Sequence, residues 1–317
     1  MVTCHRGPDG DAVGSMIALA SILRARAQRV TLYSPDLIPR SLKWLPLAKR
    51  GVAHKLKEGS RFDVTVVVDC GDPKLLGDSF PGREVTGDVI ALDHHERGAA
   101  FGDLYVCDPG AASTGVLVAR MARSRGWPLP SEAALGLYVS LASDTGTFRY
   151  SNTNGEALSL AAWLVDEGGV DPGRVSERLY EQNRLSRYRL LSAALAAVET
   201  ALDGRVAFMT VTREMVAEAR AGWEDTDGLP NYARAIEGVE CGVLITPAKH
   251  GGVRVSLRSK GHRIDAADVC AKLGGGGHRG AAGCTLAGEL GAARRRVEEA
   301  LAEALDGPVE RPRPSRV

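Results

Sequence analysis

Residues 89–95 have the sequence Val89-Ile90-Ala91-Leu92-Asp93-His94-His95, so that four apolar residues are followed at once by a carboxylate and two imidazoles. A short apolar run of this kind is typical of a buried strand in a parallel sheet. The carboxyl ends of such strands are where open α/β sheets carry their functional sites. Alone, the polar triplet is more typical of a hydrogen-bonded surface turn than of a metal site. The rest of the chain therefore decides between these two interpretations.

Three further segments place polar side chains at or after the end of an apolar run. They are His5-Arg6-Gly7-Pro8-Asp9-Gly10-Asp11, Val66-Val67-Val68-Asp69 and Ser143-Asp144-Thr145-Gly146-Thr147-Phe148-Arg149. We expect Asp69, His94 and Asp144 to end strands and therefore to meet at one edge of a sheet.

Six side chains in these segments are candidate metal ligands, namely His5, Asp9, Asp11, Asp69, His94 and Asp144. A lone Asp9 or Asp11 is better explained as a helix N-cap. Helix caps do not explain why several separate segments place imidazoles and carboxylates at one edge of the predicted sheet. Imidazoles and carboxylates without a thiolate suit two divalent ions such as Mn²⁺ better than a structural zinc. The sequence therefore predicts a two-metal site.

Composition limits the classes of protein that this chain can belong to. Its 317 residues are 44% hydrophobic and 25% charged, which is typical of a globular protein with two cored domains. A net charge of +1 argues against a protein held to long nucleic acid by a broad basic field, although a local basic groove stays open. Any nucleic-acid substrate is therefore expected to be short.

Cysteine use and hydropathy favour a cytoplasmic protein. The six cysteines include no CxxC pair, so we expect buried thiols in a reducing compartment. No run approaches the roughly 18 apolar residues of a membrane span, and no signal peptide is expected before the first motif. We expect no membrane partner.

The first 185 residues alternate short β-rich runs with helical patterns. This alternation predicts an α/β fold with a mostly parallel sheet covered by helices. The expected strands are residues 2–4, 30–33, 64–68 and 89–92. The expected helices are residues 12–27, 113–124, 131–142, 154–167 and 172–180, with Ser131 and Asn154 as N-caps.

A second, smaller α/β domain is expected after this region. Domain boundaries are predicted as residues 1–185 for the first domain, 186–203 for a linker helix and 204–317 for the second domain. The second domain is expected to contain strands at 206–211, 241–246 and 253–257 and a closing helix at 288–305. Residues from Gly307 onward form a Pro/Arg tail that we interpret as a frayed end rather than a polyanion site.

The second domain also carries the glycine-rich run Gly274-Gly275-Gly276-Gly277-His278-Arg279-Gly280-Ala281-Ala282-Gly283. A glycine run alone is more typical of a flexible turn, but beside the metal motifs it favours phosphate or nucleotide binding. Residues 280–283 are small enough to open a closely packed helix. The candidate substrate-binding residues are Arg149, Arg258, Ser259, Gly275, Gly276, Gly277, His278 and Arg279.

These motifs, in this order from His5 to Gly283, closely resemble the DHH phosphoesterase superfamily. Each motif is modest, but five in series are specific. Chain length, compact spacing and Asp227-Gly228-x-x-Asn231-Tyr232 resemble the branch of bifunctional oligoribonucleases and pAp phosphatases, often called nanoRNases.

The resemblance implies roles for the site residues. One metal would be held by His5, Asp9 and Asp69. The second would be held by Asp11, Asp69, His94 and Asp144, with Asp69 bridging. His95 would act on the substrate, with Asp93 orienting its ring, although a buried backbone brace is an equal alternative for Asp93.

The implied activity is that of a Mn²⁺-dependent phosphodiesterase. A hydroxide activated by two metals would attack phosphorus and degrade short RNA or DNA oligonucleotides, or dinucleotides, to mononucleotides, with 3′-phosphatase activity on pAp. The resemblance is compatible with a homodimer. One alternative is a family II inorganic pyrophosphatase, which shares the metal motifs but not the glycine-rich run. The other is a catalytically silent nucleotide-binding sensor.

The chain departs from the family pattern in two places. The family commonly has an Asn three residues after the second His of the motif, whereas this chain has His95-Glu96-Arg97-Gly98, which makes Arg97 the candidate replacement. Only four residues precede His5, so we expect either a start codon placed late or the lack of an entry helix that would shield the first strand.

Overall fold

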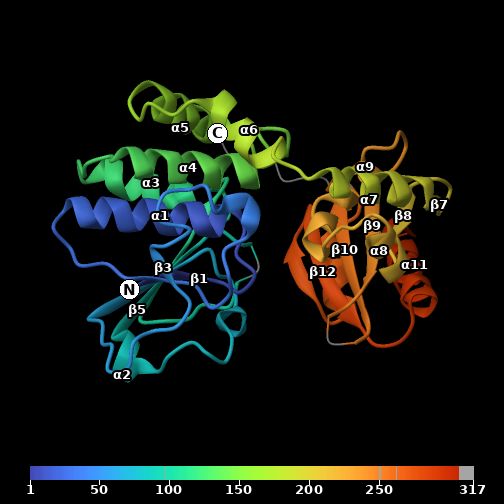
Figure 1. Cartoon of the computed structure of the whole chain (residues 1–317), viewed down its shortest axis with the longest axis horizontal. Helices are drawn as coiled ribbons and strands as arrows, with labels where there is room; N and C mark the ends of the chain where they lie inside the picture. The colour runs from blue at the N-terminus through green and yellow to red at the C-terminus, as the bar shows by residue number, and fades with distance from the viewer. Residues whose placement is uncertain (97, 250, 262, 307–317) are drawn as a thin grey trace. The chain divides into compact units, whose positions relative to one another are not determined.

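The structure is a computed structural model that describes residues 1–306 except 97, 250 and 262, and only the backbone of His278. The chain divides into two compact units, Met1–Gln182 and Asn183–Val317 (Figure 1). Arg97 and the Pro/Arg tail lie outside the described residues. Each unit is described by itself below.

The first unit is built on a parallel sheet with the strand order β3-β2-β1-β4-β5-β6. Its strands are β1 (Val2–Cys4), β2 (Leu32–Tyr33), β3 (Val52–Ala53), β4 (Val64–Val68), β5 (Asp88–Asp93) and β6 (Leu104–Cys107). Every described pair of neighbours is parallel, as the sequence predicted. The order reverses between β1 and β4, and sheets of this type bind ligands where the order reverses.

Helices α1 and α3 pack against the sheet, and α4 packs against α1 and α3 (Figure 1). The α-helices of the unit are α1 (Gly10–Ala25), α2 (Arg83–Thr86), α3 (Thr114–Ser124), α4 (Ser131–Asp144), α5 (Gly155–Asp166) and α6 (Pro172–Tyr180), and its 3-10 turns are η1 (Arg40–Leu42) and η2 (Pro73–Leu76). The expected N-cap Asn154 is confirmed, since its side chain accepts from the N–H of Ala157 at 2.9 Å. Ser131 was wrong as an N-cap: Pro130 holds that position because its carbonyl already accepts from Ala134.

Glycines allow α1 and α4 to pack closely. A Cβ added at Gly14 would lie 2.4 Å from the carbonyl oxygen of Gly136, and one at Gly10 would lie 2.3 Å from Oγ of Ser143. The contacts of residue 10 with 143 and of residue 14 with 136 mean that the two helices run antiparallel. The N-terminus of α1 therefore meets the C-terminus of α4.

The second unit contains a mixed sheet with the order β11-β12-β10-β9-β8-β7. The strands are β7 (Val198–Ala201), β8 (Val206–Thr210), β9 (Cys241–Pro247), β10 (Val253–Ser259), β11 (Gly276–His278) and β12 (Ala281–Leu286). The helices are α7 (Leu185–Ala196), α8 (Arg213–Glu218), α9 (Leu229–Arg234), α10 (Ala266–Lys272) and α11 (Leu290–Asp306), with η3 at Trp223–Thr226. Strands β8 and β9 are parallel, and the other described pairs are antiparallel.

Two expectations for the second unit were wrong. The helix predicted over residues 186–202 ends at Ala196, because the β-branched Val198 and Thr200 pair with β8 instead. Residues 280–283 do not open a helix, since Ala281–Leu286 forms β12 and pairs with β10, which satisfies its backbone groups. The role of residues 186–203 as a linker stays a prediction.

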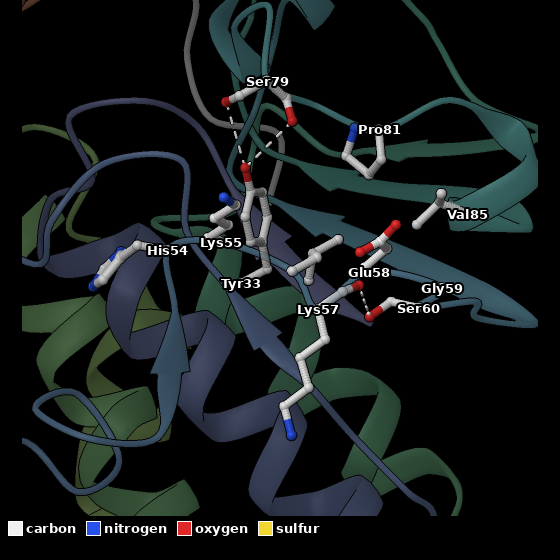
Figure 2. Close-up of a pocket in the computed structure, with 11 residues that line it drawn as sticks. Tyr33, His54, Lys55, Lys57, Glu58, Gly59, Ser60, Ser79, Pro81 and Val85 are labelled. Carbon is white, nitrogen blue, oxygen red and sulfur yellow. Dashed lines mark hydrogen bonds between the residues drawn. The ribbon is translucent and has the colours of Figure 1, made fainter.

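A pocket of about 330 Å³ lies in the first unit, and Tyr33 is one of the residues that line it (Figure 2). The phenol of Tyr33 reaches the Oγ and carbonyl oxygen of Ser79, both at 3.4 Å. Leu56, Pro81 and Val85 supply apolar walls. None of the predicted metal ligands lines this pocket.

Candidate metal centre

The predicted ligands gather at the carboxyl edge of the parallel sheet. His5 follows β1, Asp69 follows β4 and His94 follows β5. Asp144 does not end a strand as expected, because it is the last residue of α4. It still reaches this edge, since α4 runs antiparallel to α1.

The α1 end supplies two further carboxylates. Asp9 is the N-cap of α1, and its Oδ1 accepts from the N–H of Ala12 at 3.1 Å. Asp9 therefore acts as an N-cap and is also a candidate metal ligand, as the group described below shows. Asp11 lies in the first turn of α1 and is 1% exposed.

Among the residues that the structure describes, three groups of side chains have ligand atoms within 4.8 Å of one another. They are His5 with Asp9 and Asp69, Asp11 with His94 and Asp144, and Asp69 with His94 and His95. The structure thus brings together all six predicted ligands and adds His95. Asp69 belongs to the first and third of these groups, whereas the second group does not include it, so its role as a bridge stays a prediction.

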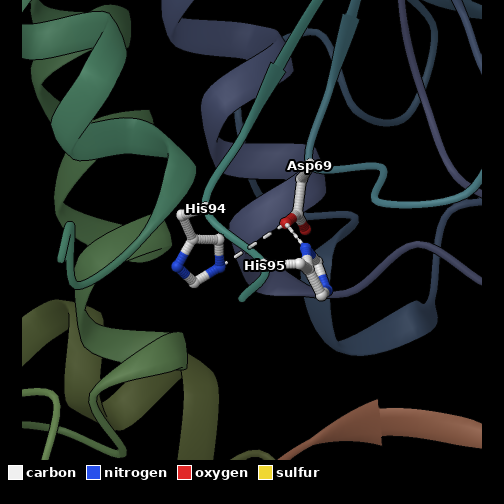
Figure 3. Close-up of side chains that lie close together, drawn as sticks. All are labelled: Asp69, His94 and His95. Carbon is white, nitrogen blue, oxygen red and sulfur yellow. Dashed lines mark ion pairs between the residues drawn. The ribbon is translucent and has the colours of Figure 1, made fainter. Parts of the chain in front are cut away.

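His94 directs one ring nitrogen at the carboxylates. Its Nδ1 lies 3.1 Å from the carbonyl oxygen of Ala111. Its Nε2 lies 3.2 Å from Oδ2 of Asp144, 3.5 Å from Oδ2 of Asp11 and 3.7 Å from Oδ1 of Asp69. Figure 3 shows the Asp69 carboxylate between the rings of His94 and His95. An imidazole nitrogen among carboxylate oxygens is a donor set that fits a divalent cation.

Burial and clustered charge shift the pKa values of these groups. Burial, and then the charge of Asp69, raises the pKa of Asp11 to about 7. Burial would lower the pKa of His5, but the hydrogen bond and charge of Asp69 raise it to about 10. For Asp69, burial would raise the pKa, but the hydrogen bond with His5 lowers it. A dense cluster of carboxylates that holds protons near neutral pH is one that a divalent cation can neutralise.

The carboxylate of Asp93 holds the ring of His95. Its Oδ1 lies 2.6 Å from Nδ1 of His95, and its Oδ2 accepts from the hydroxyl of Tyr105 at 2.8 Å. Burial would raise the pKa of Asp93, but the hydrogen bond with His95 lowers it. Sequence reasoning missed Tyr105, because the strand that carries it, β6, was not predicted. Its signal was the short apolar and β-prone run Leu104-Tyr105-Val106-Cys107.

Comparisons with known proteins agree with this geometry. Residues 1–141 match the model of the DHH family, N-terminal domain, and residues 203–306 match that of the DHHA1 domain. The chain is 34% identical to a bifunctional oligoribonuclease and PAP phosphatase of Thermus thermophilus, over 96% of this chain and 89% of the relative. This chain belongs to the DHH family.

Further comparisons support the membership. A Bacillus subtilis protein with the same description is 25% identical over 89% of this chain and 87% of its own length. The crystal structure of an exopolyphosphatase-related protein from Bacteroides fragilis matches with a TM-score of 0.87 and 26% identity, over 95% of this chain and 91% of that one. The chain is therefore a DHH phosphoesterase, with His/Asp groups suited to metal ions.

The DHHA1 domain of this phosphoesterase contains most of the candidate substrate-binding residues. Along β10, Val253, Val255 and Leu257 are buried in the core, so Arg258 lies on the opposite face of the sheet. Arg258 pairs with Ala281 of β12 on that face. Next to this pair, Gly276 pairs with Gly283, and a Cβ added at Gly276 would meet no atom within 4 Å.

The other candidates have partners close to them in the chain. The hydroxyl of Ser259 donates to the carbonyl of Ile264 at 2.5 Å and is buried. Nε of Arg279 donates to the carbonyl of Gly261 at 3.0 Å. Arg149, in the first unit, donates from Nε to the carbonyl of Gly146 at 2.7 Å. The side chain of His278 lies outside what the structure describes.

Gly275 and Gly277 have packing roles in this unit. A Cβ at Gly275 would lie 2.2 Å from the carbonyl oxygen of Gly283, and one at Gly277 would lie 2.6 Å from that of Ala281. These two glycines allow the backbones to approach closely. None of the described helices has the length and apolar character needed to cross a membrane.

Proposed function

We propose that this chain is a Mn²⁺-dependent phosphodiesterase that degrades short RNA or DNA oligonucleotides and dinucleotides to mononucleotides. We propose further that it removes the 3′-phosphate of pAp. The observation that carries the proposal is that shared residues link the three ligand groups, Asp69 in two of them and His94 in two of them, so that all six candidate ligands lie in one cluster. The printed descriptions of the relatives, oligoribonuclease and PAP phosphatase, support this choice of substrates.

The donor set supports two divalent ions. His5, Asp9 and Asp69 would hold one ion, and Asp11, Asp69, His94 and Asp144 would hold the other. When bound, such ions supply Lewis acidity that lowers the pKa of a water and neutralises charge on phosphoryl oxygens. Oxygen and imidazole ligands without a thiolate favour Mn²⁺.

His95 would work on the substrate rather than on an ion alone. Asp93 orients the ring through Nδ1, and we assign to Nε2 the donation of a hydrogen bond to a phosphoryl oxygen or of a proton to the leaving oxygen. Its pKa is raised: burial would lower it, but the hydrogen bond with Asp93 raises it. A protonated ring is suited to both of these roles.

The second unit would bind the nucleotide. The guanidinium of Arg258 is suited to a phosphate or to stacking on a base. The open backbone at Gly276 leaves room for a phosphate or a sugar beside it. Arg149, Ser259, Gly275, Gly277, His278 and Arg279 stay candidates for the same task.

We also propose a cytoplasmic location. The six cysteines are free thiols, and five of them are buried. Free thiols fit a reducing compartment.

The proposal is tested by resolving nucleotide products over time with Mn²⁺ present. The substrates are RNA and DNA oligonucleotides of increasing length from dinucleotides upward, cyclic dinucleotides, pAp and pyrophosphate. We expect mononucleotides from the short oligonucleotides, and AMP with phosphate from pAp. Turnover of pyrophosphate alone would favour the pyrophosphatase alternative. Nucleotide binding without any turnover would favour a sensor.

A further inference from the structure

A buried network of donors surrounds the carboxylate of Asp11. Its Oδ1 accepts from the hydroxyls of Ser15 at 2.8 Å and Ser140 at 2.5 Å and from the N–H of Gly115 at 3.3 Å. Its Oδ2 accepts from the N–H of Thr114 at 2.7 Å. A carboxylate oxygen has about two lone-pair sites. Oδ1 is therefore fully used by protein donors, whereas Oδ2 keeps a site that a cation can take.

Thr114 contacts two of the proposed ligands at once. Besides its N–H bond to Asp11, its hydroxyl donates to Oδ1 of Asp69 at 3.2 Å. The residue is fully buried and is the first residue of α3. The first N–H groups of a helix have no partner within the helix, so this one is free to hold a carboxylate. One residue thus fixes a carboxylate of the second ligand group together with the shared carboxylate.

Small side chains allow α3 and α4 to approach closely enough for this network. A Cβ at Gly115 would lie 2.1 Å from Oγ of Ser140. The hydroxyls of Ser113 and Ser140 lie 2.9 Å apart. Ser113 and Ser140 are also fully buried, so water does not compete for these donors.

We propose that Thr114 and Ser140 are positioning residues that orient Asp69 and Asp11 toward divalent cations. The inference rests on the proposed metal centre and goes beyond its ligands. The two hydroxyls act on different carboxylates, so their loss has different consequences. Removal of the Ser140 hydroxyl takes one of its four donors from Asp11 and weakens one ion. Removal of the Thr114 hydroxyl frees the shared Asp69 and weakens both.

The test measures Mn²⁺ binding to the full-length protein by calorimetry, with the free ion followed by its paramagnetic resonance. Thr114→Val keeps the shape and the N–H but loses the hydroxyl, and Thr114→Ser keeps the hydroxyl as the matched control. We expect Thr114→Val to weaken both binding steps by about 10- to 100-fold, the usual effect of removing a hydrogen bond to a metal ligand. Thr114→Ser should bind like the wild type. Ser140→Ala should weaken one step only.

Thr114→Ala is a second variant without the hydroxyl, in case valine disturbs the packing. Thermal unfolding of the metal-free variants checks that the fold is kept. Wild-type Mn²⁺ affinity in a folded Thr114→Val or Thr114→Ala protein would overturn the inference while leaving the metal centre intact. Failure of the wild type to bind Mn²⁺ would instead overturn the metal centre, and the inference with it.

Discussion

Asp69 holds its carboxylate on a left-handed backbone, with a φ of 57° at the end of β4. A residue other than glycine adopts this conformation at a cost, and aspartate tolerates it better than most residues. The side chain is buried and lies near His5, His94 and His95. Strain of this kind is typical of a functional site, where it fixes the direction of one side chain.

The first prediction concerns the stability of the metal-free protein and rests on proton binding by His5 and Asp11. Both pKa values are raised in the folded state, to about 10 and about 7, so the folded chain binds more protons than the unfolded chain. The contribution of His5 is complete below its unfolded pKa of about 6.5 and is lost as the pH rises through about 10. The contribution of Asp11 is complete below its unfolded pKa of about 3.8 and is lost as the pH rises through about 7. The free energy of unfolding should therefore fall as pH rises.

Mn²⁺ would take the place of these protons. The stabilisation that Mn²⁺ causes should therefore increase as the pH rises, whereas the stability of the metal-free protein falls. We expect the rise in Tm that Mn²⁺ causes, relative to chelator-treated protein, to grow between about pH 6 and pH 8. Thermal unfolding with and without Mn²⁺ across this range measures it. A rise in Tm that does not depend on pH would contradict the assignment of these two groups as ligands.

At the scale of the element, the crossing of α1 and α4 determines where Asp11 and Asp144 lie. The crossing has no room for a side chain at Gly14, where a Cβ would lie 2.4 Å from the carbonyl oxygen of Gly136. Any increase in the separation of the helices would move these carboxylates apart. Stability and metal binding are therefore linked through one helix contact.

Gly14→Ala should destabilise the protein by about 1–3 kcal/mol, the usual cost of overpacking. The Tm should fall by several degrees, at about 2–4 °C per kcal/mol for a domain of this size. Gly155→Ala is the matched control, because Gly155 begins α5 and an added Cβ meets no atom within 4 Å. That control should be neutral or slightly stabilising. Equal Tm values for the two variants would show that the α1–α4 contact adapts without cost.

The positions of the helices and strands also show which parts of the site sequence patterns can predict. The rule that polar residues follow apolar runs located Asp69 and His94, because all strands of a parallel sheet end at the same edge. It brought Asp144 to the same edge but gave the wrong element for it, since no local pattern shows that α4 runs antiparallel to α1. The sequence patterns could not identify Thr114 and Ser140 as part of the site. The N–H of Thr114 and the hydroxyl of Ser140 bond to Asp11 across 103 and 129 residues of sequence, and lone hydroxyls have no periodic signal.

The glycine-rich run of the second unit is another segment whose structure the sequence predicted only in part. Its composition favoured phosphate or nucleotide binding, which stays a proposal, whereas the structure shows that Gly275 allows a close approach to the backbone of Gly283. Its expected helix was wrong, because pairing of Ala281–Leu286 with β10 is a long-range choice that composition does not encode.

At the scale of the whole molecule, the two units have different roles in the proposed reaction. Every described group of candidate ligands lies in the first unit, whereas Arg258 lies in the second. Loss of Arg258 should therefore remove binding energy that positions the scissile phosphate rather than the groups that attack it.

Arg258→Ala should lower kcat/KM for a dinucleotide by on the order of 100-fold, the range for a lost charge-assisted contact. Hydrolysis of bis-p-nitrophenyl phosphate should fall only a few-fold, because this ester has no base or terminal phosphate to hold. Steady-state kinetics on both substrates, with metal content measured, checks this. Equal losses on both substrates would assign Arg258 to the chemical step, and no loss on either would give it a structural role.

The central claim is that Asp69 is shared by two divalent cations that carry out the reaction. The most direct measurement is the number of Mn²⁺ ions bound per chain, together with dinucleotide turnover, in the wild type and in Asp69→Ala, with circular dichroism to confirm the fold. We predict two ions and Mn²⁺-dependent turnover for the wild type. For Asp69→Ala, we predict weakened binding of both ions and no turnover. Near-native turnover by Asp69→Ala in the presence of Mn²⁺ would contradict the account.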